Sequence, residues 1–168
     1  ARAGKRVLIL EKSSTAGGNS ARSTGGMNAV KTQYQDDNGW NESAGVENTL
    51  SSAAAAYPDL AGLADVVRRE FDVWSDHPNG YFDSVGLFIL DTMASGRGRN
   101  DLELVTTLAE NSAGAVNWLA TAIGAPLPAV SFYPGSSVKR LHRPVNSEGK
   151  IVSVGAYVTP ILEQACID

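Results

Sequence analysis

The residues best suited to chemistry lie in one stretch near the N-terminus, between positions 7 and 28. Two glycine pairs, Gly17-Gly18 and Gly25-Gly26, stand there among serine, threonine and asparagine. Glycine lets a backbone approach a ligand closely, and the bare N–H groups of such loops bind anionic oxygens. Glu11 precedes both pairs, and a carboxylate at the end of a strand can accept hydrogen bonds from ribose hydroxyl groups. The stretch therefore predicts a nucleotide-binding loop.

A strand must position this loop. Four consecutive apolar residues, Val7 to Leu10, come directly before Glu11. A short apolar run of this kind is typical of a strand buried on both faces. Each feature also has an ordinary explanation, because Glu11 can be a solvated charge and a glycine pair is commonly a turn. The combination of a buried strand, a terminal carboxylate and two glycine pairs favours the binding loop.

Residues 11–29, EKSSTAGGNSARSTGGMNA, resemble the second FAD-binding segment of the fumarate reductase and succinate dehydrogenase flavoprotein family. Within that family the chain is most similar to the soluble fumarate reductases of the flavocytochrome c type. Three later stretches have counterparts in the same order: YFDSVGLFILDTMASG, NDLELVTTLAENSAGAVNWL and SVKRLHRPVNSEGK. The resemblance covers nearly the whole chain.

The resemblance implies an α/β fold built as a partial Rossmann-like FAD-binding domain. This domain would cover residues 1–135, with a large helical insertion at 46–124, and residues 136–168 would lead towards a capping domain. The first strand and the G-x-G-x-x-G loop of such a domain are missing from the sequence given. We therefore expect the chain to be a piece of a longer flavoprotein, with the remainder of the same polypeptide as its partner.

The resemblance also implies a set of FAD-binding residues, in order from the adenosine ribose to the flavin: Glu11, Lys12, Gly18, Asn19, Ser20, Thr24, Gly25 and Gly26. Glu11 would bind the ribose, with Lys12 adjacent, and the next three would line the pyrophosphate and ribityl region. Thr24 and Gly25 would lie against the isoalloxazine ring. Gly26 would present its backbone to the flavin and to a small dicarboxylate substrate, where a side chain would obstruct contact.

The attachment of the cofactor can also be predicted. Membrane-bound succinate dehydrogenases bind FAD covalently through a histidine that lies six residues before the first glycine of the second pair. Asn19 stands at that position here, so FAD is expected to bind non-covalently. The family reduces fumarate by hydride transfer from reduced flavin, with an arginine as proton donor, but its catalytic groups lie beyond residue 168 in the family's order. No catalytic residue is therefore expected here, and the later arginines are expected to be solvated: Arg97, Arg99, Arg140 and Arg143.

The composition excludes several classes of function. The chain has 168 residues, 43% of them hydrophobic and 19% charged, as in an ordinary globular domain. A net charge of −4 gives no basis for a nucleic-acid partner. No apolar run approaches the roughly 20 residues that span a bilayer. The single Cys166 excludes an internal disulfide, no cysteine and histidine spacing indicates a metal site, and no signal identifies a compartment.

Apolar periodicity predicts the supporting elements. Helices are expected at 46–57, 60–75, 84–94, 101–124 and 154–166, with Asp59, Asp83 and Asn100 as caps for the second, third and fourth. The segment VKRLHR at 138–143 alternates basic and apolar residues, which is typical of a short strand with a solvated basic face. We therefore expect His142 at the surface.

Two functions from different classes stay open. The first is the flavin-containing portion of a fumarate-reductase-type oxidoreductase. The second is a non-catalytic, mainly helical fragment that binds no cofactor by itself. The sequence favours the first for the parent protein and the second for the isolated chain, because the phosphate loop is missing. Within the enzyme class, flavoproteins that act on urocanate, aspartate or ketosteroids share the same segment.

Overall fold

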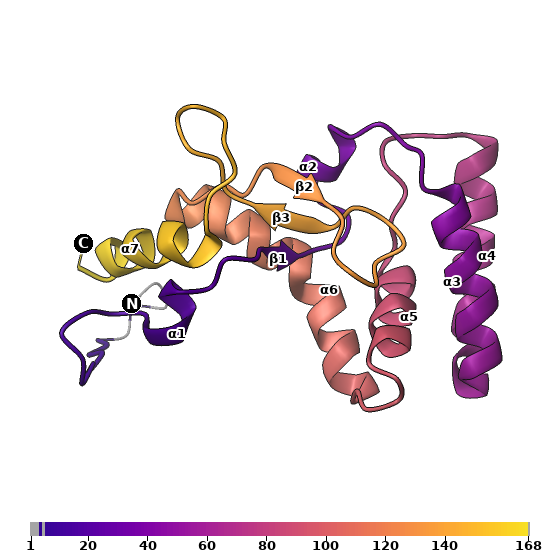
Figure 1. Ribbon diagram of the computed structural model, residues 1–168, viewed down its shortest axis with the longest axis horizontal. Coiled ribbons are helices and arrows are strands. Elements are labelled where there is room, and N and C mark those ends of the chain that lie inside the picture. Colours follow the sequence, from indigo (N-terminus) through magenta and orange to yellow (C-terminus); the bar gives the residue numbers. More distant parts are fainter. Residues whose placement is uncertain (1–3, 5, 168) are drawn as a thin grey trace.

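Helices dominate the chain. The computed structural model describes residue 4 and residues 6–167, and its helices are α1 (Gly18–Ala21), α2 (Gln33–Asp36), α3 (Ser43–Ala56), α4 (Ala61–Asp76), α5 (Val85–Ser95), α6 (Leu102–Trp118) and α7 (Val154–Ile167) (Figure 1). A 3-10 turn, η1 (Pro58–Leu60), leads into α4, and a π-helical turn, η2 (Leu119–Ile123), continues α6. The mixed fold with a large helical insertion is confirmed.

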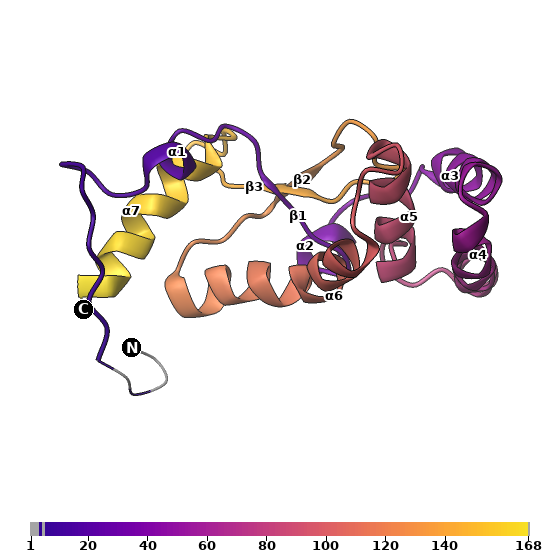
Figure 2. The same cartoon turned by 90° about the horizontal axis from the view of Figure 1, so that it is seen from below.

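A small antiparallel sheet lies between the helices. Its strands are β1 (Met27–Asn28), β2 (Ala129–Ser131) and β3 (Leu141–Arg143), in the order β1-β3-β2. The central strand β3 places His142 opposite both Met27 and Val130. Figure 2 shows the sheet crossing the middle of the molecule, with α3 and α4 at one end and α7 at the other. The sheet therefore joins the helical insertion to the glycine-rich segment.

The main core lies among α3, α4, α5 and α6. Leu60, Ala64, Val67 and Phe71 form the buried stripe of η1 and α4, at the helical spacing that the sequence predicts. Trp40 fills the gap beside this stripe, with its ring centroid 4.8 Å from that of Trp74 and 6.1 Å from that of Phe71. Such aromatic contacts stabilise a core beyond the area that they bury. The indole thereby fixes the loop between α2 and α3.

The helix caps differ from the predicted ones by one residue or more. The Ser84 hydroxyl, rather than Asp83, accepts a hydrogen bond from Leu87 N at 3.1 Å and caps α5. The carboxylate of Asp101, rather than Asn100, accepts from Leu104 N at 3.1 Å and caps α6. Asp59 lies in η1 and makes no capping bond. Asp83 does not cap α5 because its carboxylate is engaged in a buried ion pair.

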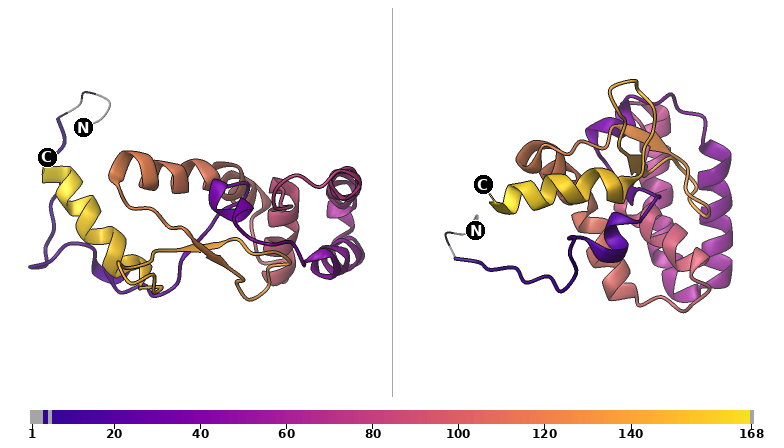
Figure 3. Two further views of the ribbon diagram at one scale, coloured as in Figure 1. Left: turned by 90° about the horizontal axis from the view of Figure 1, so that it is seen from above. Right: turned by 60° about the vertical axis from the view of Figure 1, so that its left-hand side comes forward.

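The predicted buried strand at Val7 to Leu10 is wrong. The segment has no regular secondary structure, and its four side chains are 64–85% exposed. No strand among the described residues pairs with it, so its apolar side chains stay largely exposed. Figure 3 shows this arm running outside the helical body, on the side of α7. Burial of the apolar run requires neighbours that the described residues do not supply.

None of the helices described by the structure has both the length and the apolar character needed to cross a membrane. The predicted division at residues 135 and 136 stays a prediction.

Candidate functional site

The glycine-rich segment is held in place by α7. Gly17 and Gly18 both have positive φ angles, 98° and 47°, which glycine adopts without strain. A Cβ atom on Gly17 would lie 2.4 Å from the Thr159 side chain of α7. At the other end of the turn, Ser23 O accepts hydrogen bonds from Gly155 N at 3.0 Å and from Ser153 Oγ at 2.6 Å. The first turn of α7 therefore fixes the loop from residue 17 to residue 23.

The second glycine pair has two different surroundings. A Cβ atom on Gly25 would have no protein atom within 4 Å, so this residue borders open space. A Cβ atom on Gly26 would lie 2.4 Å from the backbone oxygen of His142 and 2.8 Å from Cγ of Arg143. Gly26 must therefore be glycine because β3 lies against it, whatever else approaches its backbone.

The remaining predicted residues lie along the exposed arm and around α1. Glu11 is exposed, and its Oε1 accepts a hydrogen bond from Ser13 N at 2.8 Å. Glu11, Gly17 and Ser20 line a cavity of about 780 Å³ whose opposite wall is α7, with Thr159 and Leu162.

The other predicted residues do not line this cavity. Lys12, Gly18, Asn19 and Thr24 are exposed outside its lining. The structure thus brings Glu11 and Ser20 to one cavity and places Thr24 to Gly26 beside β3.

Behind β3 lies a buried ion triad that the sequence did not predict. Arg140 is 1% exposed, and its guanidinium donates to Asp83 at 2.6 and 3.1 Å and to Asp91 at 2.6 Å. Asp91 also accepts hydrogen bonds from Ser137 and Thr49 at 2.8 Å. Both aspartates belong to α5 or the turn before it. The triad therefore ties α5 directly to the segment that enters β3.

A closed ring of hydrogen bonds extends from this triad to His142. Gln35 Nε2 donates to Asp83 at 2.8 Å, and Gln35 Oε1 accepts from Thr32 N at 3.2 Å. Thr32 Oγ1 lies 2.6 Å from Nε2 of His142, and Nδ1 of His142 lies 2.8 Å from Arg140 O. Because a carbonyl can only accept, Nδ1 carries a proton, and the neutral ring accepts from the threonine hydroxyl through Nε2. This closed set of hydrogen bonds fixes the orientation of β3 behind Gly26.

The pKa values follow from burial and from the ion pairs. Burial lowers the pKa of His142, and the backbone carbonyls of Arg140 and Met27 only partly oppose this shift. Burial alone would lower the pKa of Arg140, but Asp83 and then Asp91 outweigh it and raise the pKa. The imidazole is therefore held neutral while the guanidinium stays charged.

Two expectations about these basic residues are wrong. Arg140 and His142 were expected in solvent and are buried, because α5 presents two carboxylates to this segment. Asp91 carried the signal that could have revealed the triad, since it interrupts an otherwise apolar helix and so requires a buried partner. Arg97 and Arg99 are exposed, as expected, whereas Arg143 is half-buried.

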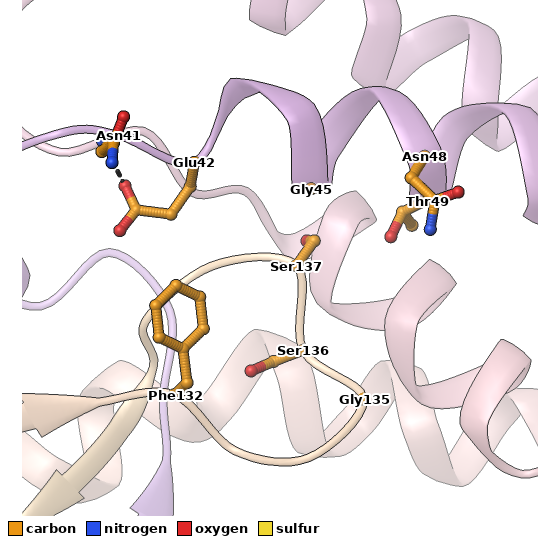
Figure 4. Close-up of a pocket in the computed structure, with 9 residues that line it drawn as sticks. All are labelled: Asn41, Glu42, Gly45, Asn48, Thr49, Phe132, Gly135, Ser136 and Ser137. Atoms are coloured by element: carbon orange, nitrogen blue, oxygen red, sulfur yellow. Dashed lines mark hydrogen bonds between the residues drawn. The ribbon is translucent and has the colours of Figure 1, made fainter.

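A second cavity lies far from the glycine pairs. It has a volume of about 400 Å³ and lies between the start of α3 and the loop after β2 (Figure 4). Glu42 at its edge accepts from Asn41 N at 2.6 Å and pairs with Lys139 at 3.2 Å. Its charge is thus neutralised within the protein, and none of the predicted cofactor residues lines the cavity. Within the described residues, no cluster of histidine, cysteine and carboxylate side chains could hold a metal ion.

Comparison with known proteins identifies the segment. Residues 1–68 match the FAD binding domain family. The chain is 35% identical over 143 residues to a probable fumarate reductase of Shewanella frigidimarina, covering 85% of this chain and 17% of the relative. It is 30% identical over 159 residues to a fumarate reductase (cytochrome) of the same species, covering 95% of this chain and 20% of the relative.

A solved structure agrees with these relatives. The open conformation of a flavocytochrome c3 fumarate reductase matches 99% of this chain and 21% of its own chain, with a TM-score of 0.65 and 32% sequence identity. The chain is therefore similar to these fumarate reductases over nearly its whole length. It spans about a fifth of the length of these relatives.

The described residues of this chain fit FAD. Gly18 and Gly25 border open space, so a ligand can reach their backbones. Glu11 and Ser20 share a cavity large enough for part of a nucleotide. Among the described residues, Asn19, Ser20 and Thr24 accept hydrogen bonds through their backbone oxygens, which leaves their side chains open to a cofactor.

Proposed function

We propose that this chain supplies the second FAD-binding segment of an oxidoreductase that reduces fumarate or a similar enoate. The flavin would supply the hydride, and the residues of this chain would bind and orient it. Glu11, Asn19 and Ser20 would hold the nucleotide portion, and Thr24, Gly25 and Gly26 would lie at the ring and at the dicarboxylate substrate.

The observation that carries this proposal is the open space at Gly25 beside the closed contact at Gly26. Open space is not unusual by itself, because Gly39 and Gly62 also have no neighbour within 4 Å, but Gly25 directly precedes a glycine that is fixed against β3. The lack of a side chain at Gly25 is explained if a flat ligand covers it. Gly26, fixed against β3, would then present its backbone at a constant position to the flavin and the substrate.

The cofactor would be bound without a covalent link, because Asn19 offers an amide where a flavin attachment would require an imidazole. Acid precipitation tests this point. The flavin should remain in the supernatant, whereas flavin that precipitates with the polypeptide would contradict the proposal.

Anaerobic turnover tests the reaction itself. The complete polypeptide that contains these residues should oxidise a reduced viologen dye when fumarate is added. A panel with fumarate, urocanate and a 3-ketosteroid enone separates the related activities. Oxidation with urocanate or the enone alone would replace fumarate as the substrate, and no oxidation with any enoate would overturn the proposed reaction.

One observation favours a second proposal for the 168-residue chain alone. The arm from Val7 to Glu11 is exposed and pairs with no strand among the described residues. We therefore expect the isolated chain to hold FAD weakly or not at all. The flavin absorption of the purified 168-residue chain, compared with that of the complete polypeptide, checks this expectation.

A further inference from the structure

Two buried polar atoms beside the second glycine pair have no partner among the described residues: Nε of Arg143 and Oδ1 of Asn28. A buried donor or acceptor without a hydrogen bond costs about 1–3 kcal/mol, so native proteins rarely keep one without a reason. No carboxylate among the described residues pairs with Arg143, whereas Lys139 and Arg140 both have acidic partners.

Both atoms belong to one face of the sheet. Met27 lies opposite His142, and Asn28 lies opposite Leu141, so the register places Gly26 opposite Arg143. Side chains alternate between the two faces of a strand, and directly paired residues share a face. Arg143 and Asn28 therefore flank the face that Gly26 leaves without a side chain. A Cβ atom on Gly26 would lie 2.8 Å from Cγ of Arg143, which agrees with this placement of Arg143.

The side-chain hydrogen bond that Arg143 makes within the described residues points to the same place. Its Nη2 donates to the backbone oxygen of Thr24 at 3.4 Å, a long bond to an exposed loop. A guanidinium has five N–H donors and binds an anionic or strongly polar oxygen better than this carbonyl. A rotation of the side chain would release its Nε and bring the guanidinium to a ligand over Gly25.

We propose that Arg143 and Asn28 recognise the carbonyl–imide edge of the flavin ring, an inference that rests on the proposed function. This edge carries an N–H group between two carbonyl oxygens. It can donate to Asn28 Oδ1 and accept from Arg143, whereas a fumarate dianion has acceptors only and would leave Asn28 unpaired. Reduction adds negative charge to the ring, so the guanidinium binds reduced flavin more tightly than oxidised flavin.

The test uses the complete polypeptide with FAD bound. Arg143→Met should lower the preference for reduced over oxidised FAD by about tenfold, which corresponds to about 30 mV in the midpoint potential of a two-electron couple. Arg143→Lys keeps the positive charge and should retain most of the potential. Arg99→Met is the matched control, since Arg99 is exposed in the loop after α5, and should leave the potential unchanged.

Each outcome decides the proposal. An unchanged potential in Arg143→Met would overturn it, as would a raised KM for fumarate at unchanged potential, which would assign Arg143 to the substrate carboxylate. If Arg143→Met does not fold, Arg143→Lys and Arg143→Gln decide, because only the first should keep the potential. If the unmodified polypeptide holds no FAD, the proposed function fails before the variants are compared.

Discussion

Polar residues have opposite surroundings in two regions of this structure. In the first region, the residues predicted to bind FAD lie on an exposed arm and loop, with few contacts to the rest of the chain. In the second, around the central strand, Arg140 and His142 are fully buried in a closed hydrogen-bonded ring that includes Asp83 and Gln35. The ligand-facing residues are therefore left free, and the buried residues fix the frame against which they stand.

This difference shows how the helical insertion contributes to the site. The ion triad connects α5 to β3, and β3 lies against Gly26. A helix that touches no predicted cofactor residue thus determines where the second glycine pair lies. The following predictions test this comparison in order of the effect expected.

Breaking the ion triad should have the largest effect. Arg140→Met leaves Asp83 and Asp91 buried without their cation, which should lower the free energy of unfolding by about 3–5 kcal/mol. Arg68→Met is the matched control, because Arg68 pairs with Glu47 at the surface and should cost less than about 1 kcal/mol. Denaturant unfolding of the 168-residue chain measures both, and equal losses would show that the triad is no stronger than a surface pair.

Adding a side chain at Gly26 should lower the stability by a smaller but clear amount. In Gly26→Ala the new methyl group would collide with the backbone oxygen of His142, and separating β1 from β3 should cost about 1–3 kcal/mol. Gly25→Ala meets no atom and should change the free energy of unfolding by less than about 0.5 kcal/mol. Thermal unfolding compares the pair, and a neutral Gly26→Ala would show that β3 does not confine this residue.

The neutral imidazole predicts a dependence of stability on pH. Because the pKa of His142 is lower in the folded chain than in the unfolded chain, the unfolded state binds more protons below about pH 6.5. The free energy of unfolding should therefore be fully retained above about pH 6.5 and fall as the pH drops through the folded pKa, by at most about 1.4 kcal/mol per pH unit.

Two histidine variants isolate this effect. His142→Gln should flatten the pH dependence, whereas His77→Gln should preserve it, since His77 is exposed in the turn after α4. Urea unfolding between pH 5 and 7 measures the slopes. A slope that survives in His142→Gln would assign the pH dependence to a group other than His142.

The smallest effect should come from the exposed arm. In the 168-residue chain, Leu8→Ser removes an apolar side chain that is already in solvent and should change stability by less than about 0.5 kcal/mol. Leu90→Ala, in the core face of α5, should cost about 2–5 kcal/mol. A large loss in Leu8→Ser would mean that the arm packs against the body after all.

The sequence predicted the helices well because apolar spacing and turn residues are local signals. The stripe from Leu60 to Phe71 and the end of the α6–η2 segment at Gly124 both agree with the structure. The N-cap of α5 was harder to predict, since Asp83 and Ser84 are equally good candidates by sequence. Only the partner of Asp83 across the fold decides between them.

The burial of Arg140 could not be predicted from its own segment, nor the exposure of the arm from its apolar run, for one shared reason. Alternation in the segment at 138–143 shows that two faces exist, but it does not show which face other elements will cover. Likewise, four apolar residues at 7–10 indicate a strand that needs neighbours, but not whether the chain supplies them. Contacts between distant residues, such as Arg140 with Asp91, decide both cases.

If the open space at Gly25 accommodates a flavin, flavin retention should depend on that space. Gly25→Val and Gly25→Ala should be prepared in the complete polypeptide and their bound flavin measured by absorbance after desalting. We expect stoichiometric FAD in the unmodified protein and its loss in Gly25→Val, with the circular dichroism spectrum unchanged. Full flavin occupancy in a folded Gly25→Val would contradict the proposal that a flavin lies over Gly25.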